Sequence, residues 1–140
     1  MNLKKLIENL KLNYVNENIT ETNFPAPEKL GKDFEIVKYE KTMTTEEVLA
    51  DLKSKGLRPA NIYELLTWTK KNWKPKETEY IAALDSVRRD SCGGRSVPCL
   101  WVSGGGGRGL RLLWYDNDWS DYGRFLCVRV QKVFGLPGGS

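Results

Sequence analysis

The stretch Trp101-Val-Ser-Gly-Gly-Gly-Gly-Arg-Gly-Leu-Arg-Leu-Leu-Trp-Tyr115 decides which class of fold the chain can adopt. After the glycines, Leu110, Leu112 and Trp114 alternate with other side chains at the period of a β-strand. This alternation predicts that Trp114 points inward. The run of glycines suits a wide turn between two strands, not the start of a helix. The stretch therefore predicts a β-hairpin.

Further strands are predicted on both sides of this turn. Residues 97–103 form the first arm of the hairpin, and a polar turn over 116–123 follows the second arm. A last strand is predicted over 124–134. Its apolar residues on one face are Leu126, Val128 and Val130. The second half of the chain is therefore rich in β-structure.

The first half of the chain predicts one strand followed by two helices. Residues 34–40 are rich in β-branched and aromatic side chains, as strands are. Thr44 and Glu47 are spaced as a capping box, which begins a helix that Gly56 ends. A second helix is predicted to begin at Pro59, since proline is favoured in the first turn. The order of strand, helix, helix and strands predicts an α+β fold.

The N-terminal residues predict a short helix and a linker. Leucine and isoleucine recur at helical spacing over 2–12, and residues 13–32 are rich in Asn, Glu, Thr and Pro. The predicted organisation is therefore helix and linker over 1–32, a ligand-binding domain over 33–134 and a flexible tail over 135–140. Packing on the domain, formation of a homo-oligomer and tethering of a partner remain three open roles for the helix.

Composition excludes several classes of function. The chain has no histidine, which removes Ser–His–Asp and Cys–His triads and histidine-ligated zinc. The net charge of +4 disfavours nucleic acid as the partner, and no apolar run is long enough to span a membrane. Three cysteines and a charged start favour a cytoplasmic protein with free thiols, although a Cys92–Cys99 disulfide stays open.

Two other motifs fail at a structural requirement. Gly104, Gly106 and Gly109 match the dinucleotide-binding pattern G-x-G-x-x-G, but that pattern must open a helix and a strand follows here. The carboxylates of 116–121 begin like a calcium-binding loop, but Cys127 stands where the bidentate glutamate belongs. We therefore expect neither a cofactor nor a metal ion.

Aromatic and arginine side chains concentrate near the C-terminal strands. Exposed Trp, Tyr and Arg on rigid elements are frequent anchors of protein recognition. Strand alternation predicts that Phe125 points inward, whereas the polar turn predicts that Trp119 and Tyr122 are exposed. The predicted contact surface consists of Trp101, Ser103, Arg108, Arg111, Tyr115, Asn117, Trp119, Ser120 and Tyr122.

The layout resembles the C-type lectin fold and, within it, the variable proteins of diversity-generating retroelements. The resemblance covers residues 33–134 and is carried by Gly56-Leu-Arg-Pro-Ala-Asn-Ile-Tyr-Glu-Leu-Leu66 and by 101–129. Phe125-Leu-Cys-Val-Arg-Val130 resembles the closing strand, which in that fold pairs with the first strand. The loop and strand motifs of calcium-dependent sugar binding are not found in the chain.

The resemblance implies a function. In such proteins a reverse transcriptase miscopies adenines, and the mutated copy replaces the 3′ part of the gene, so surface residues vary on a stable scaffold. Here the variable surface would lie between Trp101 and Tyr122, and 124–130 would stay fixed. This implies a non-enzymatic module that binds a protein or another macromolecule and does not bind a membrane. The alternatives are a small cysteine-dependent enzyme related to formylglycine-generating enzymes and a nucleic-acid-binding domain.

The distribution of residue types agrees with this resemblance. Residues 1–77 hold 13 of the 14 lysines and 8 of the 9 asparagines, whereas 78–140 hold 7 of the 8 arginines and 11 of the 13 glycines. Lysine and asparagine have adenine-rich codons, so replacement of adenines would deplete them. The alternative is that β-turns select glycine and that arginine replaces lysine on a β-surface.

Overall fold

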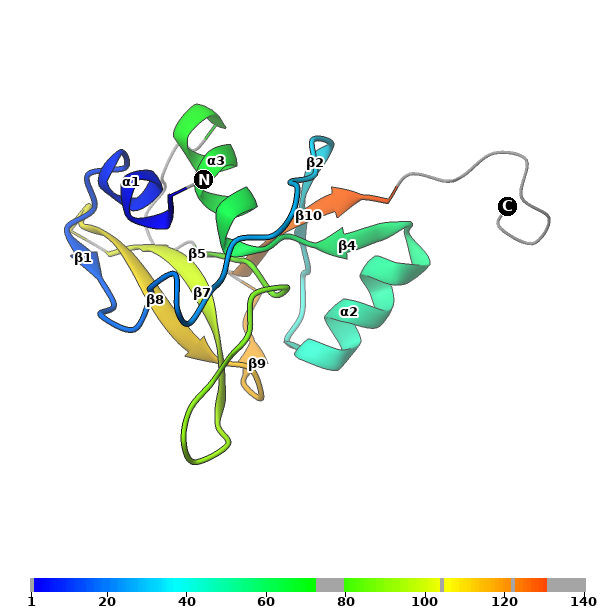
Figure 1. The fold of residues 1–140 in the computed structure, drawn as a ribbon. Coiled ribbons are helices and arrows are strands. Elements are labelled where there is room, and N and C mark those ends of the chain that lie inside the picture. Colours follow the sequence, from blue (N-terminus) through cyan, green and yellow to red (C-terminus); the bar gives the residue numbers. More distant parts are fainter. Residues whose placement is uncertain (1, 73–79, 104, 122, 131–140) are drawn as a thin grey trace.

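A large β-sheet with helices on both faces forms the body of the molecule (Figure 1). The computed structural model describes residues 2–72, 80–103, 105–121 and 123–130. The elements are α1 (Leu3–Glu8), β1 (Tyr14–Val15), β2 (Phe34–Lys38), β3 (Met43–Thr44), α2 (Thr45–Ser54), β4 (Leu57–Pro59), α3 (Ile62–Asn72), β5 (Tyr80–Ala82), β6 (Arg88–Arg89), β7 (Arg95–Val102), β8 (Arg108–Trp114), β9 (Asp118–Trp119) and β10 (Gly123–Arg129). The predicted α+β class is therefore confirmed.

Strand β10 is an interior strand of the sheet with partners along both of its edges. The main strand order is β1-β8-β7-β5-β10-β2, with β4 also paired to β10 and β6 to β7. One edge of β10 pairs antiparallel with β2, from Arg124 opposite Lys38 to Val128 opposite Phe34. Its other edge pairs with β5 in the first half and with β4 in the second. The separate two-stranded sheet consists of β3 and β9.

Two hydrophobic cores lie on opposite faces of the sheet. Leu126 and Val128 of β10 belong to the core that α1 and α3 cover. Phe125 and Cys127 alternate with them and belong to the core that α2 covers. Because both faces of β10 are covered, its sequence is an almost continuous apolar run, as expected for a strand that is buried on both sides. Val130, which follows the strand, is 51% exposed.

Local capping determines where α2 and α3 begin. The Thr44 hydroxyl accepts from the Glu47 N–H at 3.2 Å, and the Glu47 carboxylate accepts from the Thr44 N–H at 2.9 Å, which confirms the capping box. Gly56, at φ +73°, follows the last turn as predicted. The predicted start of the next helix at Pro59 is wrong. Pro59 ends β4, and Asn61 caps the helix by accepting from the Glu64 N–H at 2.9 Å.

The N-terminal segment is packed against the sheet. Helix α1 is shorter than predicted and contacts α3. The predicted linker over 13–32 contains β1, which pairs in parallel with β8, and the buried residues Ile19 and Phe24. This packing could not be predicted from the polar composition of the segment, because only a few widely spaced apolar side chains enter the core.

Several other predictions can be compared with the structure. The hairpin of 97–103 and 110–115 is confirmed as β7 and β8. Cys92 is exposed and Cys99 is buried, and both thiols are free, so the disulfide that was left open is not formed. Residues 131–134 and the tail predicted over 135–140 lie outside the described residues.

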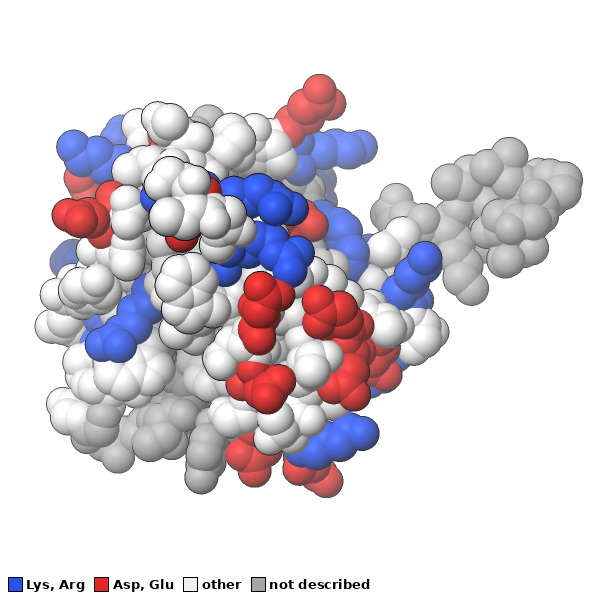
Figure 2. All heavy atoms as spheres, turned by 90° about the horizontal axis from the view of Figure 1, so that it is seen from below, with Lys and Arg blue, Asp and Glu red and all other residues white. Residues whose placement is uncertain are grey.

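The charged surface is mixed. Figure 2 shows a cluster of acidic side chains next to a group of lysines and arginines, with further charges of both signs scattered over the same face. Among the helices that the structure describes, none combines the length and the apolar character that crossing a membrane requires.

Candidate functional site

The register of β7 and β8 brings Trp101 and Arg111 together. Trp101 lies opposite Gly109, and Arg111 follows two residues later on the same face. Gly109 has no side chain to separate them. Cζ of Arg111 therefore lies 4.1 Å from the centroid of the Trp101 ring, a distance typical of a cation–π contact. Two residues predicted from the sequence thus form one contact pair.

Tyr14 of β1 adds a second aromatic ring to this pair. β1 extends the sheet beyond β8 and places Tyr14 beside Gly109. Cζ of Arg111 lies 5.6 Å from the centroid of the Tyr14 ring, and Tyr14 is 50% exposed. The sequence prediction missed Tyr14, because it lies in the segment taken for a linker. The only available signal was a large aromatic residue within a polar run.

A hollow of about 180 Å³ opens beside these three side chains. Its walls are formed by Asn13, Tyr14, Trp101, Ser103, Gly107, Arg108, Gly109 and Arg111. Four of the nine predicted contact residues are therefore gathered here. The described residues of the walls include two arginines and no carboxylate, so the hollow suits an anionic or aromatic group.

Hydrogen bonds fix the loop at the rim of this hollow. The Ser103 hydroxyl accepts from the Gly107 N–H at 3.0 Å, and the Gly107 carbonyl accepts from the Ser103 N–H at 2.7 Å. Gly106 has φ +84°, a conformation that favours glycine. The Asn13 side chain accepts from the Arg108 N–H at 2.8 Å. The rim is therefore held in place by contacts with the N-terminal segment as well as within the turn.

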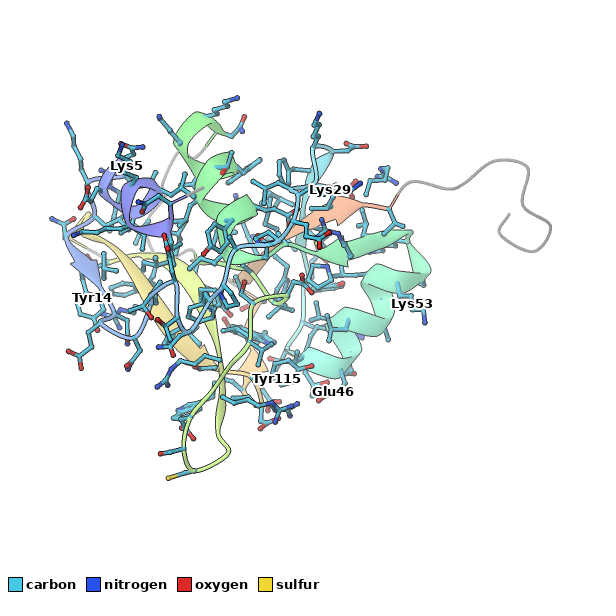
Figure 3. The ribbon with its side chains drawn as sticks, viewed as in Figure 1. Lys5, Tyr14, Lys29, Glu46, Lys53 and Tyr115 are labelled. Carbon is cyan, nitrogen blue, oxygen red and sulfur yellow. The ribbon has the colours of Figure 1, made fainter. Side chains whose placement is uncertain are left out.

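Tyr115 and Asn117 lie away from the hollow. Tyr115 shares a face with Arg111 but lies four residues along the chain, about 13 Å away in an extended strand. Figure 3 shows Tyr14 and Tyr115 at separate places on the molecule. Cζ of Arg95 lies 4.1 Å from the centroid of the Tyr115 ring. The Asn117 side chain is exposed. These two predicted residues are outside the walls of the hollow.

The predicted exposure of Trp119 is wrong. Trp119 is 1% exposed, because β9 folds back onto β3 and carries the ring into the core. Its indole N–H donates to the Thr45 hydroxyl at 2.8 Å, and its ring packs at a right angle on Phe125 at 5.6 Å. Phe125 points inward as predicted. Trp119 is thus a scaffold residue and not a contact residue.

Neither Ser120 nor Tyr122 of this turn is placed at the hollow by the described residues. Ser120 is partly buried, and its N–H donates to the Tyr80 hydroxyl at 3.2 Å. Tyr122 lies outside the described residues. The predicted inward orientation of Trp114 is also wrong. Trp114 is 62% exposed, because it stands at the end of β8, beyond the part that the core covers.

The buried thiols are poorly suited to nucleophilic chemistry. Burial raises the pKa of the Cys99 thiol far above its ordinary value. Burial, with a smaller contribution from Glu35 and against the opposing effect of Lys55, raises the pKa of Cys127 to about 12. Because the thiolate is the reactive form, neither side chain has the character of an activated nucleophile. Within the described ranges, no group of three or more His, Cys, Asp or Glu side chains could hold a metal ion.

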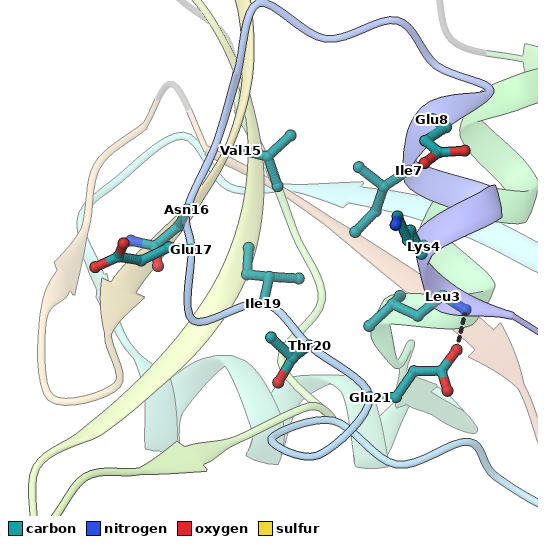
Figure 4. Close-up of a pocket in the computed structure, with 10 residues that line it drawn as sticks. All are labelled: Leu3, Lys4, Ile7, Glu8, Val15, Asn16, Glu17, Ile19, Thr20 and Glu21. Atoms are coloured by element: carbon teal, nitrogen blue, oxygen red, sulfur yellow. Dashed lines mark hydrogen bonds between the residues drawn. The ribbon is translucent and has the colours of Figure 1, made fainter.

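A second, larger hollow lies beside α1 and contains none of the predicted contact residues. It measures about 400 Å³ and lies between α1 and the segment 15–21. Leu3, Ile7, Val15 and Ile19 form its apolar walls (Figure 4). The Glu21 carboxylate accepts from the Leu3 N–H at 2.8 Å and joins the two sides.

Comparison of the chain with protein-family models, with curated proteins and with solved structures finds no match.

Proposed function

We propose that the protein is a non-enzymatic ligand-binding module with a C-type lectin-like fold, which binds a protein or another macromolecule. The binding face is formed by β1, β7 and β8. The observation that carries this proposal is the hollow in which Trp101, Arg108 and Arg111 meet beside an exposed tyrosine. Aromatic and arginine side chains on paired strands give a rigid, partly apolar contact area of the kind that protein partners use.

The connectivity of the domain supports the lectin-like part of the proposal. From β2 to β10 the chain forms a strand, two helices and a group of strands, with the short strand β3 before the first helix and β4 between the two helices. The first and last of these strands, β2 and β10, pair antiparallel along five residues each. This is the pairing that the resemblance implies for the closing strand.

Residues of the segment 56–66 form a polar network around the buried Glu64 carboxylate. Arg58 donates to the buried Glu64 carboxylate through both terminal nitrogens, at 2.9 and 2.7 Å. The same carboxylate accepts from the Gly31 N–H at 2.6 Å and from the Asn61 N–H at 3.0 Å. This network joins β4, α3 and the N-terminal segment. A scaffold fixed in this way tolerates changes on a distant surface.

The proposal includes diversification of the binding face by a retroelement. The contact side chains stand on strands whose opposite face enters a core, so substitutions at the face leave the core unchanged. The scarcity of lysine and asparagine after residue 77 agrees with replacement of adenines in this part of the gene. The DNA around the gene tests this. We expect a repeat that matches the 3′ part of the gene except at adenines, beside a reverse transcriptase gene.

A pair of displayed libraries tests the binding function itself. The first randomises Trp101, Ser103, Arg108 and Arg111 together, and the matched control randomises the buried Leu100, Leu110 and Leu126. We expect most members of the first library to resist protease and to yield binders to unrelated purified proteins, whereas members of the control are cleaved. Cleavage of both libraries alike would show that the face is part of the scaffold and would contradict the proposal.

A further inference from the structure

We propose that the hollow beside Trp101 and Arg111 recognises a carboxylate, carried by an aspartate or glutamate side chain of a protein partner. This inference rests on the proposed function, because it names the partner's chemistry at the same face. Its basis is the environment of one guanidinium group. Arg111 is oriented by aromatic rings and has no carboxylate partner within the described part of the chain.

The contacts of Arg111 leave its N–H groups available. The rings of Trp101 and Tyr14 contact the guanidinium through their π-systems, which use none of its N–H donors. No hydrogen bond or ion pair joins Arg111 to another described residue. The side chain is therefore positioned before a partner arrives, which lowers the entropy cost of a two-point contact with a carboxylate.

Other arginines of the chain show the contrast. Three of them have intramolecular carboxylate partners: Arg58 with Glu64, Arg95 with Asp116 and Arg129 with Glu35. Each of these pairs joins two different segments of the chain. Arg111 is exposed and has aromatic partners in place of a carboxylate, so its charge is available to a group from outside the chain.

Size and charge favour an acidic side chain over a nucleic acid. A hollow of about 180 Å³ is smaller than the ~300–1,000 Å³ of small-molecule sites and admits one or two side chains. A nucleic-acid strand requires a continuous basic track along its phosphates. The hollow offers no such track, because Arg108 and Arg111 are the only basic residues among the described residues that line it. Arg111 beside a small hollow complements a single carboxylate.

Two labelled peptides provide the test. One consists of four Gly-Ser-Glu repeats and the other of four Gly-Ser-Gln repeats, and their binding to the full chain is measured by fluorescence anisotropy. We expect the Glu peptide to bind about tenfold more tightly, the factor that a charge-assisted hydrogen-bonded pair supplies. The NMR signal of the Arg111 Nε–H group should shift with the Glu peptide and not with the Gln peptide.

Matched variants distinguish binding at Arg111 from a general effect of the positive charge of the protein. Arg111→Gln should remove the preference for the Glu peptide, and Arg111→Lys should lose most of it, because lysine lacks the planar two-point donor. Arg89→Gln makes the same change of charge at an exposed arginine of β6 and should keep the preference. Unchanged melting temperatures show that each variant is folded.

Three results would overturn the inference. They are equal affinity for the two peptides, an equal effect of Arg89→Gln and Arg111→Gln, and tighter binding of an oligo-thymidine strand than of the Glu peptide. The display experiment keeps the two proposals distinguishable. If the randomised face yields folded binders while the natural chain does not discriminate between the peptides, the carboxylate inference fails and the binding function stands.

Discussion

At the scale of single residues, two tryptophans five positions apart have opposite environments. Trp119 is enclosed by Phe125 and Thr45, whereas Trp114 is 62% exposed. We expect Trp119→Ala to lower the free energy of unfolding by about 3–5 kcal/mol, because it leaves a cavity and removes the N–H that donates to the Thr45 hydroxyl. Trp114→Ala should change it by less than about 1 kcal/mol. Urea unfolding followed by circular dichroism measures both, and equal effects would contradict the assignment.

These two residues also show the limit of sequence patterns. Strand alternation identified Phe125 correctly, because β10 is regular and covered along its length. Trp114 obeys the same alternation but stands where the covering core ends. Trp119 lies in a polar turn, and its burial depends on pairing with β3, more than seventy residues earlier in the chain. A local pattern carries no information about such a long-range contact.

Glu64 offers a second prediction, based on pH. Burial by itself raises the pKa of Glu64, but Arg58 and the N–H groups of Asn61 and Gly31 outweigh it and hold the pKa below its ordinary value. The ionised carboxylate therefore stabilises the folded state above the ordinary value of 4.5, and this contribution is lost as the pH falls through the lowered pKa. We expect Glu64→Gln to lower the free energy of unfolding at neutral pH by about 2–3 kcal/mol.

The difference between Glu64→Gln and the natural chain should shrink below pH 4.5, the ordinary glutamate value. Glu28→Gln is the control, because Glu28 is exposed. It should have little effect at either pH. Denaturant unfolding at neutral and acidic pH measures these quantities. A difference that is constant with pH would show that the network acts through shape and not through the charge of Glu64.

At the scale of elements, the N-terminal segment provides the clearest test of the fold. Leu3, Ile19 and Phe24 are buried in the core beneath α3. Each such side chain contributes about 1.5–3 kcal/mol when buried, so their joint loss approaches the whole stability of a domain. We expect removal of residues 1–24 to abolish cooperative thermal unfolding. Tyr14→Ala, which removes an exposed ring from the same segment, should leave it intact. If the truncated chain unfolds at the same temperature as the full chain, residues 13–24 act as the linker that the sequence predicts and not as part of the core.

Long elements could be predicted from the sequence, and two-residue strands could not. The alternation of 110–115 and the capping box of Thr44 and Glu47 identified β8 and α2, because each repeats a local signal. The strands β1, β3 and β9 span two residues each, too few to show a period. Only part of the proposed binding face could accordingly be predicted. Its β7 and β8 residues followed from the hairpin, whereas Tyr14 depended on the pairing of β1.

At the scale of the whole molecule, strand β10 and the proposed binding face should differ in stability. β10 has strands on both edges and cores on both faces, so opening it requires global unfolding. β1 is a two-residue strand at the end of the sheet, held to β8 through the Asn13 and Asn16 N–H groups at 2.8 and 2.9 Å. We expect the amides of β10 to exchange with solvent at the rate that global unfolding sets.

The Asn13 and Asn16 amides should exchange faster, with an opening free energy about 2 kcal/mol or more below the global value. Hydrogen exchange measured by NMR on the folded chain gives both values. The physical reason is that β1 has a single neighbouring strand, so local opening breaks few contacts. Such a difference would let Tyr14 adjust to a partner while Trp101 and Arg111 stay on the rigid hairpin. Equal protection of β1 and β10 would mean that β1 and the scaffold open together, and that the proposed binding surface is rigid throughout.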